Sequence, residues 1–266
     1  MKHLKKFLSL LLALALVFLP VTPAAASLLP EEGVNLEGYT VIIHTNDTHS
    51  RAVPKDGSMG FTAVSALKKF CESNGVEVIL LDAGDTLHGL PFANLVEGKS
   101  IVDIMNLAGY DAMTPGNHDF NYGTDTLKKR AEEMNFPLIS ANITVKEDGS
   151  DFLKDHIIIE KNGIKFGIFG LSTPETAYKT NPKNVETISF NNPIDAAKEE
   201  VEELKKSGAD FIIALAHLGV DEGSEFTSKL VADKVEGIDL IVDGHSHTIF
   251  EEGYKVKNTL IVSTGD

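Results

Sequence analysis

The hydrophobic pattern of this chain switches repeatedly between two periods after residue 38. Short runs rich in Val, Ile and Leu predict buried strands, and apolar residues spaced three and four apart predict amphipathic helices. The expected strands are 39–47, 76–85, 111–115, the extended segment 136–142, the hairpin 156–172, 210–218 and 238–247, with a final hairpin-like pair that ends at Asp266. The expected helices are 62–73, 100–109, 124–134, 193–208 and 224–235.

Residues that begin or end helices and turns support these boundaries. Gly109 closes the helix before it, Asn162 and Gly163 form the turn of the hairpin, and Pro193 and Gly208 bracket the longest helix. Strands that alternate with helices predict an α/β layered fold, with central, mostly parallel sheets flanked by helices. Ligands in such folds gather beyond the carboxyl ends of the strands.

The first 38 residues follow a different pattern. A basic start, "MKHLKK", precedes the apolar run "FLSLLLALALVFL" and the small residues "TPAAAS". This pattern predicts a signal peptide over residues 1–26, because the apolar run is short for a membrane anchor. We therefore expect a linker at 27–38, a single domain at 39–266, no membrane span after cleavage, and a secreted or extracytoplasmic protein.

Composition narrows the function classes. The chain has 39 Asp and Glu against 24 Lys and Arg, so a groove for a nucleic-acid polymer, which needs a basic surface, is not expected. The single cysteine, Cys71, excludes a disulfide within the chain and is expected to be buried in a helix. The fold must therefore depend on its core, together with any bound metal.

Polar side chains with metal-binding chemistry collect where the predicted strands end. The segments "NDTH", "GD", "GNHD" and "GHSH" each follow an apolar strand, and His217 ends another. Five of the nine histidines lie at these exits: His49, His118, His217, His245 and His247. A solvated loop would also be polar, but it would not select His and Asp at five separate strand ends.

The residue types at these exits predict a site for two divalent ions. Carboxylate, amide oxygen and imidazole suit Zn, Mn, Co or Fe, and the absence of a thiolate excludes a Cys-type structural zinc site. The ligands expected on this basis are Asp47, His49, Asp85, Asn117, His217, His245 and His247. Seven ligands exceed one tetrahedral site, so we expect two ions ~3.5–4 Å apart, with the Asp85 carboxylate as bridge and a hydroxide formed between them. In an extended segment Asp47 and His49 would project to one side, as would His245 and His247.

The combined pattern "NDTH…GD…GNHD…H…GHSH" resembles the five-part signature of the calcineurin-like metallophosphoesterases. "HTNDTH", "DAGDTLHG" and "GNHDFNYG" are more narrowly similar to the secreted bacterial 5′-nucleotidases and 2′,3′-cyclic-nucleotide phosphodiesterases. The resemblance implies one metal site from Asp47, His49, Asp85 and His247, and a second from Asp85, Asn117, His217 and His245. It places His118 outside the metal shell, touching the phosphate or the leaving oxygen as a catalytic residue.

Asn121 is expected to be the second catalytic residue, as the partner of His118, and it leaves the substrate class open. Many 5′-nucleotidases have Asp three residues after this histidine, where it can pair with the imidazole, whereas Asn121 can offer its amide carbonyl to the ring N–H. Asp119 is expected to shape the loop instead. The cyclic-phosphodiesterase branch resembles the "FNYG" variant, so a nucleotide monoesterase and a 2′,3′-cyclic diesterase with 3′-nucleotidase activity both remain, with a non-catalytic metal- or nucleotide-binding surface protein as a third class.

Three other histidines have less defined expectations. His44 should face away from the site as a core or supporting residue, His88 could approach the substrate, and His156 is expected on the surface. The resemblance also predicts a C-terminal nucleoside-binding domain that this chain lacks. The chain stops at "LIVSTGD", so we expect a metal domain that is truncated at its C-terminal edge.

Overall fold

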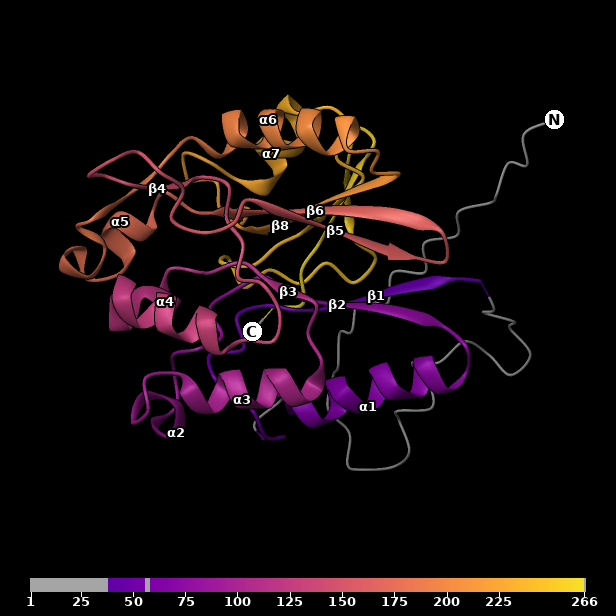
Figure 1. The fold of residues 1–266 in the computed structure, drawn as a ribbon, viewed down its shortest axis with the longest axis horizontal. Coiled ribbons are helices and arrows are strands. Elements are labelled where there is room, and N and C mark those ends of the chain that lie inside the picture. The colour runs from indigo at the N-terminus through magenta and orange to yellow at the C-terminus, as the bar shows by residue number, and fades with distance from the viewer. Residues whose placement is uncertain (1–37, 56–57, 266) are drawn as a thin grey trace.

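Two β-sheets lie face to face at the centre of the protein, and helices cover the outer face of each (Figure 1). The structure is a computed structural model that describes residues 38–55 and 58–265. The predicted signal peptide and linker residues 27–37 lie outside the described residues. No helix in the described part is long and apolar enough to cross a membrane.

The first sheet has three parallel strands, β1 (Thr40–Thr45), β2 (Glu77–Asp82) and β3 (Ala112–Met113), in the order β1-β2-β3. Successive residues of β2 point to opposite faces, as strand geometry requires. Ile79 and Leu81 enter the core between the sheets, and Leu80 enters the core beneath the helices. The strand is therefore apolar on both faces, which explains its unbroken hydrophobic run.

The second sheet has six strands in the order β10-β11-β9-β8-β6-β5. Its members are β5 (His156–Lys161), β6 (Ile164–Ser172), β8 (Phe211–His217), β9 (Leu240–Val242), β10 (Tyr254–Val256) and β11 (Thr259–Val262). The four inner strands are parallel, and the two edge strands run antiparallel to their neighbours. In β8, Ile213 and Leu215 face the first sheet while Ala214 and Ala216 face the helices.

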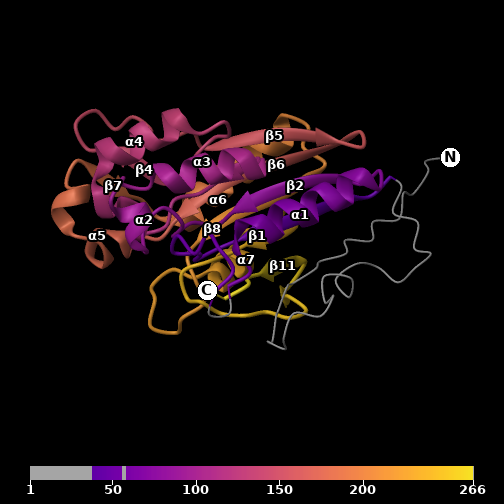
Figure 2. The same cartoon turned by 90° about the horizontal axis from the view of Figure 1, so that it is seen from below.

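Helices cover both sheets (Figures 1 and 2). Helices α1 (Gly60–Ser73), α3 (Lys99–Ala108) and α4 (Thr124–Glu133) pack on one side, and α6 (Pro193–Lys206) and α7 (Ser228–Lys234) on the other. The α6 boundaries agree with the prediction, because Asn192 caps its first turn and Gly208 follows its end with φ +80°. Helix α7 begins at Ser228 rather than at residue 224, because the Thr227 side chain caps it at that point.

Several short elements were not predicted. They are α2 (Pro91–Asn94), α5 (Thr176–Lys179), the 3₁₀ helices η2 (His118–Tyr122) and η3 (Pro182–Val185), and the paired strands β4 (Ile143–Val145) and β7 (Ile188–Phe190). The predicted extended segment 136–142 forms only isolated bridges, from Leu138 to Met113 and from Ile139 to Lys154. Elements of three to five residues carry too few apolar positions to establish a period.

The strand register brings the polar exits together. Thr45 lies opposite Asp82, Asp82 opposite Met113, and Ser172 opposite His217, so the loops after these strands emerge side by side. The two sheets are joined at this edge by the His217 ring, whose Nδ1 donates to the Ala83 carbonyl at 2.7 Å. The predicted α/β fold, with its polar cluster at the carboxyl ends of the strands, is confirmed.

Candidate metal centre

Two groups of ligand atoms lie at this edge of the sheets. Asp47, His49 and His247 form one group, and Asp85, His217 and His245 form the other. Within each group the potential ligand atoms lie within 4.8 Å of one another. The groups adjoin at His217. Its Nε2 lies 3.3 Å from Oδ2 of Asp85 in its own group and 4.0 Å from Oδ1 of Asp47 in the other group.

The backbone that presents these side chains is in the left-handed region. Positive φ angles occur at five of them: Asp47 (51°), His49 (43°), Asp85 (56°), His245 (80°) and His247 (50°). Such angles cost about 1–2 kcal/mol at a residue with a Cβ, and they concentrate at functional sites. The prediction that each pair projects from an extended segment is therefore wrong. The left-handed turns separate His245 and His247 into different groups, while Asp47 and His49 remain together.

Asp119 holds the loop that carries Asp85. Its carboxylate accepts hydrogen bonds from the backbone N–H groups of Gly116 (2.8 Å), Asp85 (2.8 Å), Thr86 (3.0 Å) and Leu87 (2.8 Å). Asp119 is only 1% exposed, so these four donors have no access to water. The predicted loop-shaping role of Asp119 is confirmed, and the residue fixes the backbone on both sides of the site.

Two glycines are required by close approach. Gly84 has φ +90°, and a Cβ there would overlap the backbone of Gly116. A Cβ on Gly116 would overlap Oδ1 of Asp85 and lie 2.6 Å from Cε1 of His217. The loops after β2 and β3 can therefore pack against each other only where both positions are glycine.

Two buried polar atoms among the predicted ligands form no well-aligned hydrogen bond, although Nε2 of His217 has the Asp85 carboxylate 3.3 Å away. They are Oδ1 of Asn117 and Nε2 of His217, on residues that are 3% and 0% exposed. Leaving a buried polar atom unpaired costs about 1–3 kcal/mol, so a native site needs a partner for each. Divalent ions supply that partner, since amide oxygen, imidazole nitrogen and carboxylate are suitable ligands. The residues present therefore fit a metal centre.

The charges in the site are strongly coupled. Burial opposes a proton on His217, but the adjacent Asp85 carboxylate outweighs it and raises the pKa of His217 to about 10. Burial raises the pKa of Asp85, but the neighbouring His217 outweighs burial, and the pKa of Asp85 is lowered. Burial lowers the pKa of His49 and of His245 to about 4, which keeps both imidazoles neutral and able to bind a cation.

His118 lies next to both groups without belonging to either. Its backbone N–H donates to Oδ1 of Asp85 at 2.7 Å, and its ring stands edge-on to His49 with centroids 5.3 Å apart. Nδ2 of Asn121 lies 3.0 Å from Nδ1 of His118, and its carbonyl oxygen accepts from the Thr180 hydroxyl at 2.8 Å. The predicted pairing of the Asn121 carbonyl with the imidazole N–H is therefore wrong, because the amide nitrogen faces the ring.

Comparison with known proteins agrees with this geometry. The family model described as calcineurin-like phosphoesterase matches residues 40–248. The chain belongs to the calcineurin-like phosphoesterase family. Over 218 residues it is 36% identical to a 5′-nucleotidase of Vibrio cholerae, an alignment that covers 77% of this chain and 39% of the relative.

Solved structures of phosphoesterases share the fold. The 5′-nucleotidase precursor of Thermus thermophilus superposes with a TM-score of 0.71 at 27% identity, over 84% of this chain and 48% of that one. The calcineurin-like phosphoesterase YfkN of Bacillus subtilis gives 0.70 at 27% identity, over 84% of this chain and 81% of that one. This phosphoesterase chain thus spans about two fifths of the length of the V. cholerae nucleotidase.

Sequence reasoning missed two residues of this phosphoesterase site. Glu175 precedes α5 and places Oε2 3.0 Å from Nε2 of His245, and Lys179 lies 2.7 Å from the same carboxylate oxygen. The pKa of Glu175 is about 2, because hydrogen bonds from Lys179 and His245 outweigh the effect of burial. Lys179 lies in a short helix and Glu175 directly before it, in a segment without a motif, so no sequence signal could have identified them.

The remaining sequence expectations have mixed outcomes. Cys71 is buried, as predicted. His44 is buried among core residues with neither ring nitrogen hydrogen-bonded, which confirms its place outside the site. His156 is not a simple surface residue, because its Nδ1 lies 2.6 Å from Oε2 of Glu200 on α6 and its side chain is 27% exposed. His88 lies close to His118.

Proposed function

We propose that this chain is the metal domain of a secreted phosphohydrolase that uses two divalent ions to release phosphate from nucleotides. The observation that carries the proposal is the pair of adjoining ligand groups, with the buried Oδ1 of Asn117, which has no hydrogen-bond partner, as a further potential ligand. The 5′-nucleotidase relatives support nucleotides as the substrate class.

In this proposal the seven predicted ligands divide as the family resemblance implies. Asp47, His49, Asp85 and His247 would hold one ion, and Asp85, Asn117, His217 and His245 would hold the other. When bound, such ions lower the pKa of a water and offset the negative charge of the phosphate. The ligand set suits Zn, Mn, Co or Fe and does not select one of them.

His118 serves as the general acid in the proposed reaction. The bond from phosphorus to the ribose oxygen breaks as the oxygen of a water, which gives up a proton to solvent, bonds to phosphorus. Nε2 of His118 donates a proton to the leaving oxygen and regains one from solvent. Its backbone bond to Asp85 supports this place at the edge of the metal centre. General acids of this kind contribute about 10²–10⁴-fold in rate.

A second substrate class is favoured by one contact. The amide nitrogen of Asn121 faces Nδ1 of His118 and can only donate to it, so it favours a neutral ring, whereas a carboxylate there would stabilise the protonated ring. A neutral imidazole is a weaker acid than an imidazolium, so it suits an easier leaving group, such as an oxygen of a strained 2′,3′-cyclic phosphate. The alternative function is therefore 2′,3′-cyclic-nucleotide phosphodiesterase with 3′-nucleotidase activity.

Phosphate release from AMP and hydrolysis of 2′,3′-cyclic AMP, each measured with Mn²⁺, separate these alternatives. Release from AMP supports the leading proposal, and exclusive hydrolysis of the cyclic diester supports the alternative. Asp85→Ala should abolish turnover and lower the bound metal, whereas Asp221→Ala, at an exposed position, should leave both unchanged. Full turnover by Asp85→Ala contradicts the dimetal mechanism, and metal binding without any hydrolysis supports the non-catalytic surface protein.

Secretion is tested separately. N-terminal sequencing of the protein exported by its host should begin near Ser27, after the small residues that precede the expected cleavage point. An N-terminus at Met1 on protein that stays inside the cell contradicts the predicted signal peptide.

A further inference from the structure

His88 and His118 form a parallel pair of imidazoles. Their ring centroids lie 6.0 Å apart and their planes differ by 10°. His88 comes from the loop after β2, and His118 begins η2 after β3. Neither metal group contains His88, and the proposed reaction does not use it. Its fixed place beside the general acid therefore needs a separate explanation.

The amide of Asn121 joins the two rings. Nδ2 of Asn121 lies 3.0 Å from Nδ1 of His118 and 3.2 Å from Nδ1 of His88. A primary amide has two N–H groups, so it can donate one to each ring. Oδ1 accepts from the Thr180 hydroxyl, and the backbone carbonyl of Asn121 accepts from Nδ2 of Asn184 at 2.8 Å. The side-chain amide and the backbone carbonyl of Asn121 therefore all have hydrogen-bond partners, which hold the amide in this orientation.

This arrangement determines where each neutral ring carries its proton. A ring whose Nδ1 accepts a hydrogen bond must hold its single proton on Nε2. For His118 that is the nitrogen on the side opposite Asn121, and it is the atom that donates in the proposed reaction. A carboxylate at position 121 has no N–H to offer, so it would favour the opposite tautomer in both rings.

The position of His88 is itself held by its neighbours. Gly89 donates to Oδ1 of Asn94 at 3.0 Å and accepts from Nδ2 of Asn94 at 2.8 Å. The Tyr122 hydroxyl donates to the same Oδ1, and its ring lies 5.3 Å from the His88 ring. A Cβ on Gly89 would lie 2.6 Å from the carbonyl carbon of His49, so the loop passes close under the metal centre.

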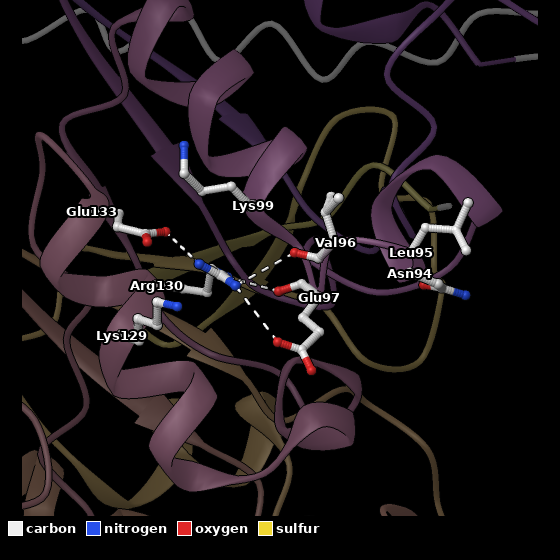
Figure 3. Close-up of a pocket in the computed structure, with 8 residues that line it drawn as sticks. All are labelled: Asn94, Leu95, Val96, Glu97, Lys99, Lys129, Arg130 and Glu133. Carbon is white, nitrogen blue, oxygen red and sulfur yellow. Dashed lines mark hydrogen bonds and ion pairs between the residues drawn. The ribbon is translucent and has the colours of Figure 1, made fainter.

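The turn after Asn94 is also anchored, as Figure 3 shows. Arg130 on α4 is 5% exposed, and its Nε donates to the Glu97 carbonyl at 2.8 Å while Nη1 pairs with Glu133 at 2.5 Å. The support beneath His88 thus extends from α4 through α2 to the loop at Gly89. The backbone beside His88 is thus anchored, and its ring lies against the rings of Tyr122 and His118.

We propose that His88 is a positioning residue for His118. By accepting the second N–H of the Asn121 amide, it keeps the first aimed at Nδ1 of His118 and so holds neutral His118 with its proton on Nε2. An imidazole at position 88 and an amide at position 121 are then a matched pair. The test by kcat rests on the proposed function, whereas the test by ¹⁵N spectroscopy of the His118 ring does not depend on it.

Three variants of the metal-loaded chain test the proposal. His88→Asn keeps an acceptor near the place of Nδ1, His88→Gln moves it toward the place of Nε2, and His88→Phe keeps the ring without an acceptor. We expect His88→Phe and His88→Gln to lower kcat by about 3- to 10-fold, the loss of one neutral hydrogen bond, with little change in KM. His88→Asn should restore kcat to within about twofold of the wild type.

The tautomer of His118 is read directly from the ¹⁵N signals of its ring in the zinc-loaded chain. The wild type and His88→Asn should show a proton on Nε2 and an accepting Nδ1, and His88→Phe should show a mixture of tautomers. Thermal unfolding checks that each variant is folded, and if His88→Phe fails to fold, the Asn and Gln variants decide the question.

Two outcomes overturn the inference. One is an unchanged His118 tautomer and kcat in His88→Phe. The other is rescue by Gln instead of Asn, together with a raised KM in His88→Asn, because His88 would then contact the substrate through Nε2. A chain that hydrolyses no nucleotide contradicts the proposed function, while the ¹⁵N signals still decide the role of His88.

Discussion

Oε2 of Glu175 lies 3.0 Å from Nε2 of His245, so a carboxylate holds the ring of a predicted metal ligand. Such a carboxylate fixes the tautomer and orientation of the imidazole and increases its basicity. Here the carboxylate comes from the loop before α5, and the ligand from the loop after β9.

Glu175→Gln should lower metal affinity by about 10–100-fold, because an amide orients His245 less firmly and does not increase its basicity. Competition between the chain and a fluorescent chelator for Zn²⁺ measures the change. Glu202→Gln, at an exposed position on α6, is the matched control. Equal affinities of the two variants would show that Glu175 does not support the metal centre.

Gly116→Ala should abolish metal binding, because the new Cβ would overlap Oδ1 of Asp85 and crowd His217. Metal content after purification and dialysis reports the loss. Gly223→Ala provides the control, since a Cβ there meets no atom within 4 Å. Normal metal content in Gly116→Ala would be inconsistent with the packing of the two loops.

Asp119→Ala should destabilise the fold by about 3 kcal/mol or more, because four buried N–H groups would lose their acceptor. Urea unfolding of the metal-free chain measures the free energy without a contribution from bound ions. Asp221→Ala should change it by less than about 0.5 kcal/mol, as expected for an exposed side chain. A small effect of Asp119→Ala would mean that the loop rearranges to find other partners.

Stability should also depend on pH through His44. Burial lowers the pKa of His44 from its ordinary value of 6.5 to about 4 in the folded chain. The folded state therefore favours the neutral ring, and this contribution is present above pH 6.5 and is lost as the pH falls through about 4. The shift corresponds to about 3 kcal/mol.

His44→Leu should remove this part of the acid sensitivity. Free energies of unfolding of the metal-free wild type and variant, measured between about pH 7.5 and pH 4.5, should diverge as the pH falls, with the variant less affected. His49 and His245 also have lowered pKa values, but they are present in both proteins and cancel in the difference. Parallel pH curves would contradict a buried, neutral His44.

The sequence by itself determined the layered fold and the composition of the site. Apolar runs such as β2 and β8 read as buried strands because both of their faces are covered. Since parallel strands end at one edge of a sheet, His and Asp at successive strand exits had to meet. Six of the seven predicted ligands lie in the two groups, and Asn117 has a buried oxygen that lacks a partner.

Only the tertiary structure decided how these residues are oriented and supported. Left-handed backbone angles present five of the ligands, four hydrogen bonds to Asp119 hold the loop at Asp85, and Glu175 reaches His245 from the loop before α5. It also turned the Asn121 amide so that its nitrogen faces His118 and His88. Most of these contacts join residues far apart in the chain, and periodicity and spacing carry information only about neighbours along one strand, helix or turn.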